Sequence, residues 1–163
     1  MIAYLVWRVL PRRKPPALTA QAPEEAAQTA KGTRLPRDGA KPLTVAGIQH
    51  RSDDLRAAMA AKLKRYRADL GDDSIDDDET VELEVAARLQ FEDSNVHDPN
   101  AVAVLIGQRH VGYVPAGMAP LFRAYVKRKA LRGPVYLCDA EVEVEVKSGE
   151  PVSMTLMLPP LKT

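Results

Sequence analysis

The chain changes character near Leu43, where a sustained pattern of apolar and polar positions begins. Upstream of that point, residues 11–42 are rich in Pro, Ala, Lys, Arg, Thr and Gln and show no apolar period, which is typical of a disordered linker. We therefore expect a disordered basic tail over residues 1–42, with a short apolar N-terminus, followed by one folded domain over residues 43–160.

Two segments have the apolar spacing of amphipathic helices. The first begins at Ser52, a residue suited to an N-cap, with Asp53 and Asp54 in the first turn. Its apolar positions are Leu55, Met59, Leu63, Tyr66 and Leu70. The second helix carries Met118, Leu121, Phe122 and Tyr125 and ends in the basic cluster Lys127, Arg128, Lys129 and Arg132. The first helix also carries Lys62, Lys64, Arg65 and Arg67, which form either a solvated face or a ridge that meets phosphates.

The rest of the folded part has the signals of β-strands, with strict alternation over residues 81–85 and 141–146. We expect strands over residues 43–50, 81–91, 101–106, 109–114, 134–146 and 151–158, with a bulge or a close backbone approach at Gly47. This inventory predicts a mainly β, α+β fold in which about six antiparallel strands curl into a small OB-like or SH3-like barrel. Residues 71–79 form an acidic segment that we interpret as a mobile loop; it lacks the mid-loop Gly and terminal Glu of an EF-hand.

Charge is divided unevenly along the chain. Residues 1–42 hold eight Lys/Arg against three Asp/Glu, whereas residues 43–163 hold fifteen against nineteen. A global positive field therefore cannot draw a nucleic acid to the folded part, and such binding needs a local basic patch or the basic tail.

The single cysteine and the short apolar N-terminus limit the kinds of protein that this chain can be. One cysteine, Cys138, excludes an internal disulfide and a multi-cysteine zinc cluster, and its strand-like surroundings favour a buried position. The apolar residues 1–10 are too few to span a membrane, so we expect a cytoplasmic protein, with peripheral membrane association through this segment left open.

The densest chemistry lies between Glu92 and Ala101. Asp98-Pro99-Asn100 is typical of a type I turn, in which the Asp side chain caps the backbone and Pro fixes φ. That turn accounts for Asp98 and Pro99, but it leaves Asn95 and His97 unexplained beside a strand edge.

The run from Asn95 to Val104, followed by Gly112-Tyr113-Val114-Pro115, resembles the HIRAN domain. The shared pattern is an Asn, an aromatic residue or His, then Asp, any residue, Asn-Ala and an aliphatic strand, with a Gly-Tyr-aliphatic-Pro element in the next strand. Val45-Ala46-Gly47 also fits the first strand of that family. The resemblance implies an OB-like barrel that binds single-stranded DNA at its free 3′ end and works beside a helicase, nuclease or other DNA repair protein.

The resemblance also implies roles for individual residues. Asp98 would accept a hydrogen bond from the terminal 3′-hydroxyl, Asn95 would bond the terminal nucleotide, and His97 would stack on a base or contact a phosphate. Tyr113 would line the pocket. The sequence departs from the pattern at Thr44, Ala46 and Ala116, where characterised members carry an aromatic or a lysine. The candidate nucleic-acid-binding residues that would compensate are Arg51, His110, Lys127 and Arg128.

Three classes of function remain to be compared. The first is a non-catalytic module for single-stranded DNA, and the second is a protein-interaction or regulatory domain that keeps the fold without the DNA pocket. The third is an enzyme, which we do not expect because the chain has no phosphate-binding GxxxxGK[ST] loop. We also expect no cofactor, although His97, Asp98 and His110 are in principle able to bind a metal.

Overall fold

In the computed structural model, which describes residues 32–70 and 79–162, the longest strand is β3 (Thr80–Phe91). It pairs antiparallel with β6 (Val135–Glu145), and every residue of β6 has a partner on β3. Exposed and buried side chains alternate along β3, so that one face of this pair is dry and the other meets solvent.

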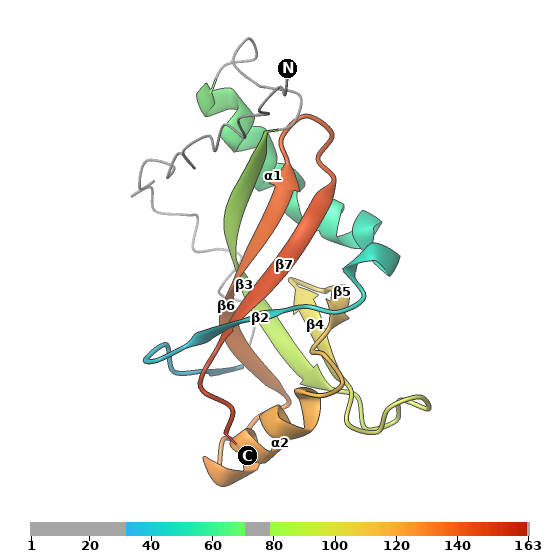
Figure 1. Cartoon of the computed structure of the whole chain (residues 1–163), viewed down its shortest axis with the longest axis vertical. Helices are drawn as coiled ribbons and strands as arrows, with labels where there is room; N and C mark the ends of the chain where they lie inside the picture. Colours follow the sequence, from blue (N-terminus) through green and yellow to red (C-terminus); the bar gives the residue numbers. More distant parts are fainter. Residues whose placement is uncertain (1–31, 71–78, 163) are drawn as a thin grey trace, which may run out of the picture.

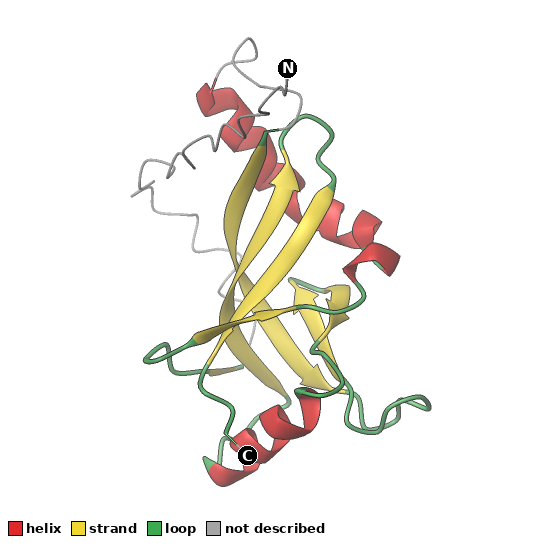
Figure 2. Ribbon diagram, in the orientation of Figure 1, coloured by secondary structure: helices red, strands yellow, loops and turns green. Residues whose placement is uncertain are grey.

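The other described elements extend this pair into a seven-stranded sheet with two α-helices (Figures 1 and 2). The further strands are β1 (Thr33–Arg34), β2 (Lys41–Thr44), β4 (Val102–Ile106), β5 (Arg109–Tyr113) and β7 (Pro151–Leu158); the helices are α1 (Ser52–Leu70), α2 (Ala119–Arg128) and a 3₁₀ turn over Ile48–His50. The path is β2-β7-β6-β3-β4-β5, with β1 parallel to β6 and the other pairs antiparallel. The predicted mainly β, α+β fold is confirmed.

The predicted barrel is not confirmed, because the path of strands stays open between β2 and β5. Within the described residues, the two ends of the path meet at one isolated bridge between Ala46 and Tyr113. The amide of Ala46 donates to the carbonyl of Tyr113 at 2.8 Å, and the reverse bond is 2.9 Å. One bridge fixes the two edges near each other without forming a ladder.

Two predictions about the start of the fold were wrong. Residues 33–34 and 41–44 are strands and Leu35 is buried, so order begins before Leu43. The strand expected over residues 43–50 ends at Thr44. Val45 still donates its amide to Met154 of β7, whereas Ala46 pairs with Tyr113 of β5, and Gly47 then turns the chain with a φ of 79°. The predictions for residues 1–31 and for the acidic segment 71–78 lie outside the described residues.

The dry face of the sheet packs against both helices. Leu55, Met59 and Leu63 of α1 and Phe122 of α2 are buried in the same apolar cluster as the inner residues of β3, β6 and β7. Cys138 belongs to this core, as predicted, with 2% of its surface exposed. Burial and then the charge of Asp139, opposed by that of Arg34, raise the pKa of its thiol to about 12. Neither helix of the described part is long and apolar enough to cross a bilayer.

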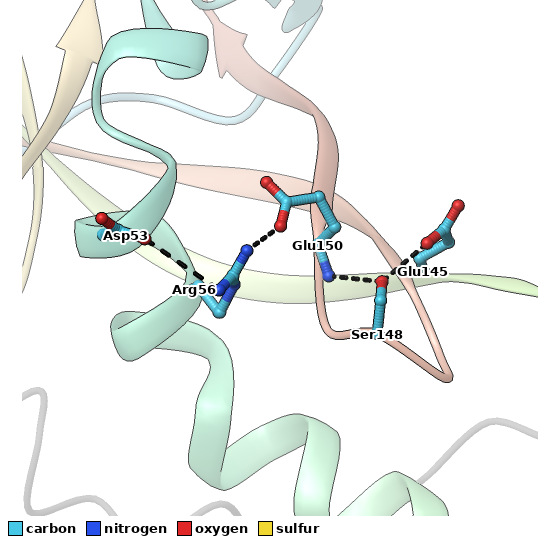
Figure 3. Close-up of polar contacts among 5 residues, drawn as sticks. All are labelled: Asp53, Arg56, Glu145, Ser148 and Glu150. Atoms are coloured by element: carbon cyan, nitrogen blue, oxygen red, sulfur yellow. Dashed lines mark hydrogen bonds and ion pairs between the residues drawn. The ribbon is translucent and has the colours of Figure 1, made fainter.

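Helix α1 is fastened to the β6–β7 turn by polar contacts (Figure 3). Arg56 forms an ion pair with Glu150, and Ser148 receives the amide of Glu150 within the turn. Arg67 donates to the carbonyls of Val146 and Lys147 at 2.7 and 3.0 Å. One cation of the basic face predicted on this helix is therefore used within the fold, whereas Lys62, Lys64 and Arg65 are exposed.

The bridge at Ala46 requires glycine at position 112. A Cβ on Gly112 would lie 2.6 Å from Val45 Cγ1 and 2.7 Å from the carbonyl oxygen of Ala46. We expect Gly112→Ala to lower the free energy of unfolding by about 1–3 kcal/mol, measured by urea denaturation, because the two segments must move apart. Gly117→Ala is the control, since nothing lies within 4 Å of the added Cβ. Equal stability of the two variants would contradict the close packing.

Candidate nucleic-acid interface

The loop between β3 and β4 ends in the turn that the sequence predicts. The amide of Ala101 donates to the carbonyl of Asp98 at 3.0 Å, and the amide of Asn100 donates to Asp98 Oδ1 at 2.8 Å. The carboxylate therefore caps its own turn with one oxygen. Its second oxygen, Oδ2, has no hydrogen-bond or ion-pair partner among residues 32–70 and 79–162.

Asn95 organises the same loop from within. Its Oδ1 accepts the amides of His97 at 3.0 Å and Asp98 at 3.2 Å, and its Nδ2 donates to Glu92 Oε2 at 2.9 Å. The sequence prediction gave Asn95 a contact with a nucleotide, but here its carbonyl and one amide hydrogen hold the loop itself. Spacing along the chain does not reveal which polar atoms a loop consumes internally.

Glu92 joins the loop to the neighbouring strand. The Tyr113 hydroxyl donates to the same Oε2 atom at 3.2 Å, so one carboxylate oxygen receives both Asn95 and Tyr113. Burial first, and then the charge and hydrogen bond of Glu92, raise the pKa of Tyr113, while the nearby positive charge of Arg51 lowers it. The sequence analysis did not select Glu92, because a glutamate at the end of a strand carries no distinguishing signal.

Further predicted residues gather around Tyr113. The ring of His110 meets that of Tyr113 edge-on at 4.6 Å between centroids, and its Nε2 lies 2.9 Å from the carbonyl of Gly112. Arg51 directly follows the 3₁₀ turn over Ile48–His50, and this turn contacts β5, the strand that holds His110 and Tyr113. The structure thus brings Asn95, Asp98, Tyr113, His110 and Arg51 into one neighbourhood.

The middle of the loop faces solvent. His97 is exposed, and no side-chain partner is seen for its ring in the described part of the chain. Val96, beside it, is 90% exposed. An exposed imidazole next to an exposed aliphatic side chain is available for contact with another molecule.

Arg123 of α2 fixes the loop from the other side. Its guanidinium donates to the carbonyls of Asn100 at 2.9 Å and Ala101 at 3.0 Å, pairs with Asp93 at 2.6 Å, and lies 4.3 Å above the ring of Phe91. Only 19% of the Arg123 side chain is exposed. Sequence reasoning missed this residue, since it lies outside the basic cluster and about twenty residues from the loop.

The two predicted cations of α2 are less closely associated with the loop. Lys127 is four residues after Arg123, so it lies on the same helix face one turn further along. Arg128 lies 6.0 Å from the ring of Tyr125 on its own helix. Neither residue forms a hydrogen bond or ion pair with residues 92–101.

Within the described ranges, no three His, Cys, Asp or Glu side chains are grouped so that they could hold a metal ion.

No family model matches this chain, and neither the curated proteins nor the solved structures contain a significant match. The resemblance to the HIRAN domain therefore stays a prediction that rests on the motif residues themselves.

The contacts of Arg123 predict a measurable effect on the loop. We expect Arg123→Ala to lower the free energy of unfolding by about 1–3 kcal/mol, because the variant loses hydrogen bonds from a partly buried cation. Amide hydrogen exchange in residues 92–101 should accelerate more than exchange elsewhere. Arg109→Ala is the control, since Arg109 makes an exposed ion pair with Asp54, and it should change stability by less than about 1 kcal/mol. Similar hydrogen exchange in the two variants would contradict the role of Arg123 in holding the loop between β3 and β4.

Proposed function

We propose that this chain is a non-catalytic module that binds single-stranded DNA, with a preference for a free 3′-hydroxyl end. The contacts come from a surface that we call the end-binding surface. Its residues are His97, Asp98, Tyr113, His110 and Arg51. The observation that carries the proposal is the Asp98 carboxylate, which is held in place by one oxygen and keeps the other without a partner in the described part.

The chemistry of Asp98 supports recognition of an end. A carboxylate oxygen accepts the hydrogen of a terminal hydroxyl, whereas a phosphodiester or terminal phosphate brings no hydrogen and adds negative charge. The nearby His97 ring is exposed and suits stacking on a base, an interaction worth about 1–3 kcal/mol for each base. Arg51 supplies a cation for the backbone.

The rigidity of the loop supports the same proposal. Asn95 accepts amides from within the loop, and Arg123 of α2 donates to the carbonyls at the end of the loop. The loop therefore has little conformational freedom to lose when a ligand binds. In the HIRAN-like interpretation, Asn95 then positions Asp98 and need not contact the nucleotide directly.

A second candidate is the protein-interaction domain, and Val96 is the observation that favours it. This aliphatic side chain is 90% exposed at the middle of a fixed loop, where a protein partner would bury it. The positions of Thr44 and Ala46, where an aromatic residue would support stacking, also suit a surface without a base. Negligible binding to every oligonucleotide would favour this candidate.

Asp98→Asn tests the proposed function without disturbing the turn. The Oδ1 of Asn still accepts the amide of Asn100, whereas the charge and the free acceptor are lost. We expect wild-type protein to prefer an oligonucleotide with a free 3′-hydroxyl over the same oligonucleotide with a 3′-phosphate. The variant should bind the hydroxyl end about tenfold more weakly, as expected for a lost hydrogen bond to a charged group.

Fluorescence anisotropy with a 5′-labelled strand measures both affinities. Asp69→Asn is the matched control, because it removes one exposed carboxylate at the end of α1. If the two variants had equal affinity for the hydroxyl end, Asp98 would not be the recognition group.

The basic N-terminal segment should set the salt dependence of binding. Residues 1–31 hold five Lys/Arg and two Glu, whereas residues 43–163 are net negative. Deleting residues 1–31 preserves β1 and should flatten the slope of log affinity against log salt, because fewer counterions are released. An unchanged slope would show that these cations do not meet the strand.

A further inference from the structure

The hydrogen bond between Tyr113 and Glu92 determines which polar groups the end-binding surface offers. A phenol has one hydrogen to donate, and Tyr113 gives it to Glu92 Oε2. What remains on the Tyr113 oxygen is acceptor capacity alone. Asp98 Oδ2 is likewise an acceptor.

Glu92 also carries charge to this position. No ion pair of Glu92 is seen across the described ranges, and the groups that it contacts, Asn95 and Tyr113, are neutral. Asn95 links the Glu92 carboxylate to the backbone amide of Asp98, so the two acidic residues contact the same amide side chain. The positive charge of Arg51 acts in the opposite direction to Glu92 and lowers the pKa of Tyr113.

We propose that Glu92 is a specificity-determining residue that makes the end-binding surface accept hydrogen bonds and reject added negative charge. It does so by binding the Tyr113 hydrogen and by supplying a second carboxylate behind Asp98. The ligand end must then supply the donor, so a terminal hydroxyl is admitted and a terminal phosphate is excluded. This inference rests on the proposed function and adds a residue that the sequence pattern did not single out.

The expected size of the effect follows from the distance and the solvent. Glu92 acts from the far side of Asn95 in a half-buried position, where water still screens its charge. Removing that charge should therefore reduce the preference for a hydroxyl end over a phosphate end by about three- to tenfold, and most of the change should be tighter binding of the phosphate end.

Glu92→Gln separates charge from structure. The side-chain oxygen of Gln still accepts from Asn95 and Tyr113, so the loop keeps its bonds while the charge is lost. Glu79→Gln is the matched control: the Tyr66 hydroxyl donates to Glu79 Oε1 at 3.3 Å, which is the same pair of groups at the opposite end of β3. Both variants change the net charge equally.

The experiment measures affinities of wild type, Glu92→Gln and Glu79→Gln for 5′-labelled oligonucleotides that end in a 3′-hydroxyl or a 3′-phosphate. Thermal unfolding of each protein is recorded alongside. We expect a reduced hydroxyl preference in Glu92→Gln alone, with unfolding close to that of wild type.

The other outcomes separate the two proposals. If wild type prefers the hydroxyl end and Glu92→Gln keeps that preference, or weakens both affinities in proportion, the role of Glu92 is overturned while the proposed function stands. If wild type binds neither oligonucleotide, the proposed function and this inference are both overturned.

Discussion

The pairing of β3 with β6 is the constraint on which the rest of this structure depends. Because every residue of β6 pairs with β3, two opposite ends of the sheet are fixed at once. One end holds α1 and the β6–β7 turn, and the other holds α2 and the candidate loop (Figure 1). At that second end the rings of Phe91, Phe122 and Tyr136 meet within 6.0 Å of one another, so Glu92 begins the loop from a fixed position.

On the solvent-exposed face of the β3–β6 pair, carboxylates of like charge lie opposite one another. Glu82 lies opposite Glu143, and Glu84 opposite Glu141, an arrangement that destabilises a sheet slightly. Solvent screens these carboxylates, and the hydroxyls of Thr80 and Ser153 donate to Glu143. On the inner face Leu89, Val142 and Val144 are fully buried, and this apolar burial offsets the repulsion. This acidic surface also explains why the folded part needs local cations for any contact with a nucleic acid.

The loop between β3 and β4 is held by groups from three separate parts of the chain. Arg123 arrives from α2, Tyr113 from β5, and Asn95 from the loop itself. Under the proposed function, these contacts would hold His97 and Asp98 in a defined arrangement before a ligand binds, which would lower the entropic cost of binding. The loop is thus joined to α2 and β5 by side-chain contacts.

The sequence by itself determined the elements whose signal is local. Strict alternation located β3 and the later half of β6, a compact apolar run located β4, and the turn at Ser148-Gly149 pointed to β7. Helical spacing located α1 and α2, and Asp98-Pro99-Asn100 gave the turn. Each of these elements depends on residues a few positions apart, so the period of the side chains and the turn residues can be recognised in the sequence. The motif also drew attention to the loop between β3 and β4. It gave no measure of which side chains in that loop remain available.

Tertiary structure alone decided the features that join distant segments. Strand β1 is two residues long and exists because β6 offers it a partner, so no local pattern could announce it. The open path between β2 and β5 depends on where Gly47 turns the chain. Glu92 and Arg123 gained their importance from groups that the fold brings to them, since a hydrogen bond depends on position in space and not on separation along the chain.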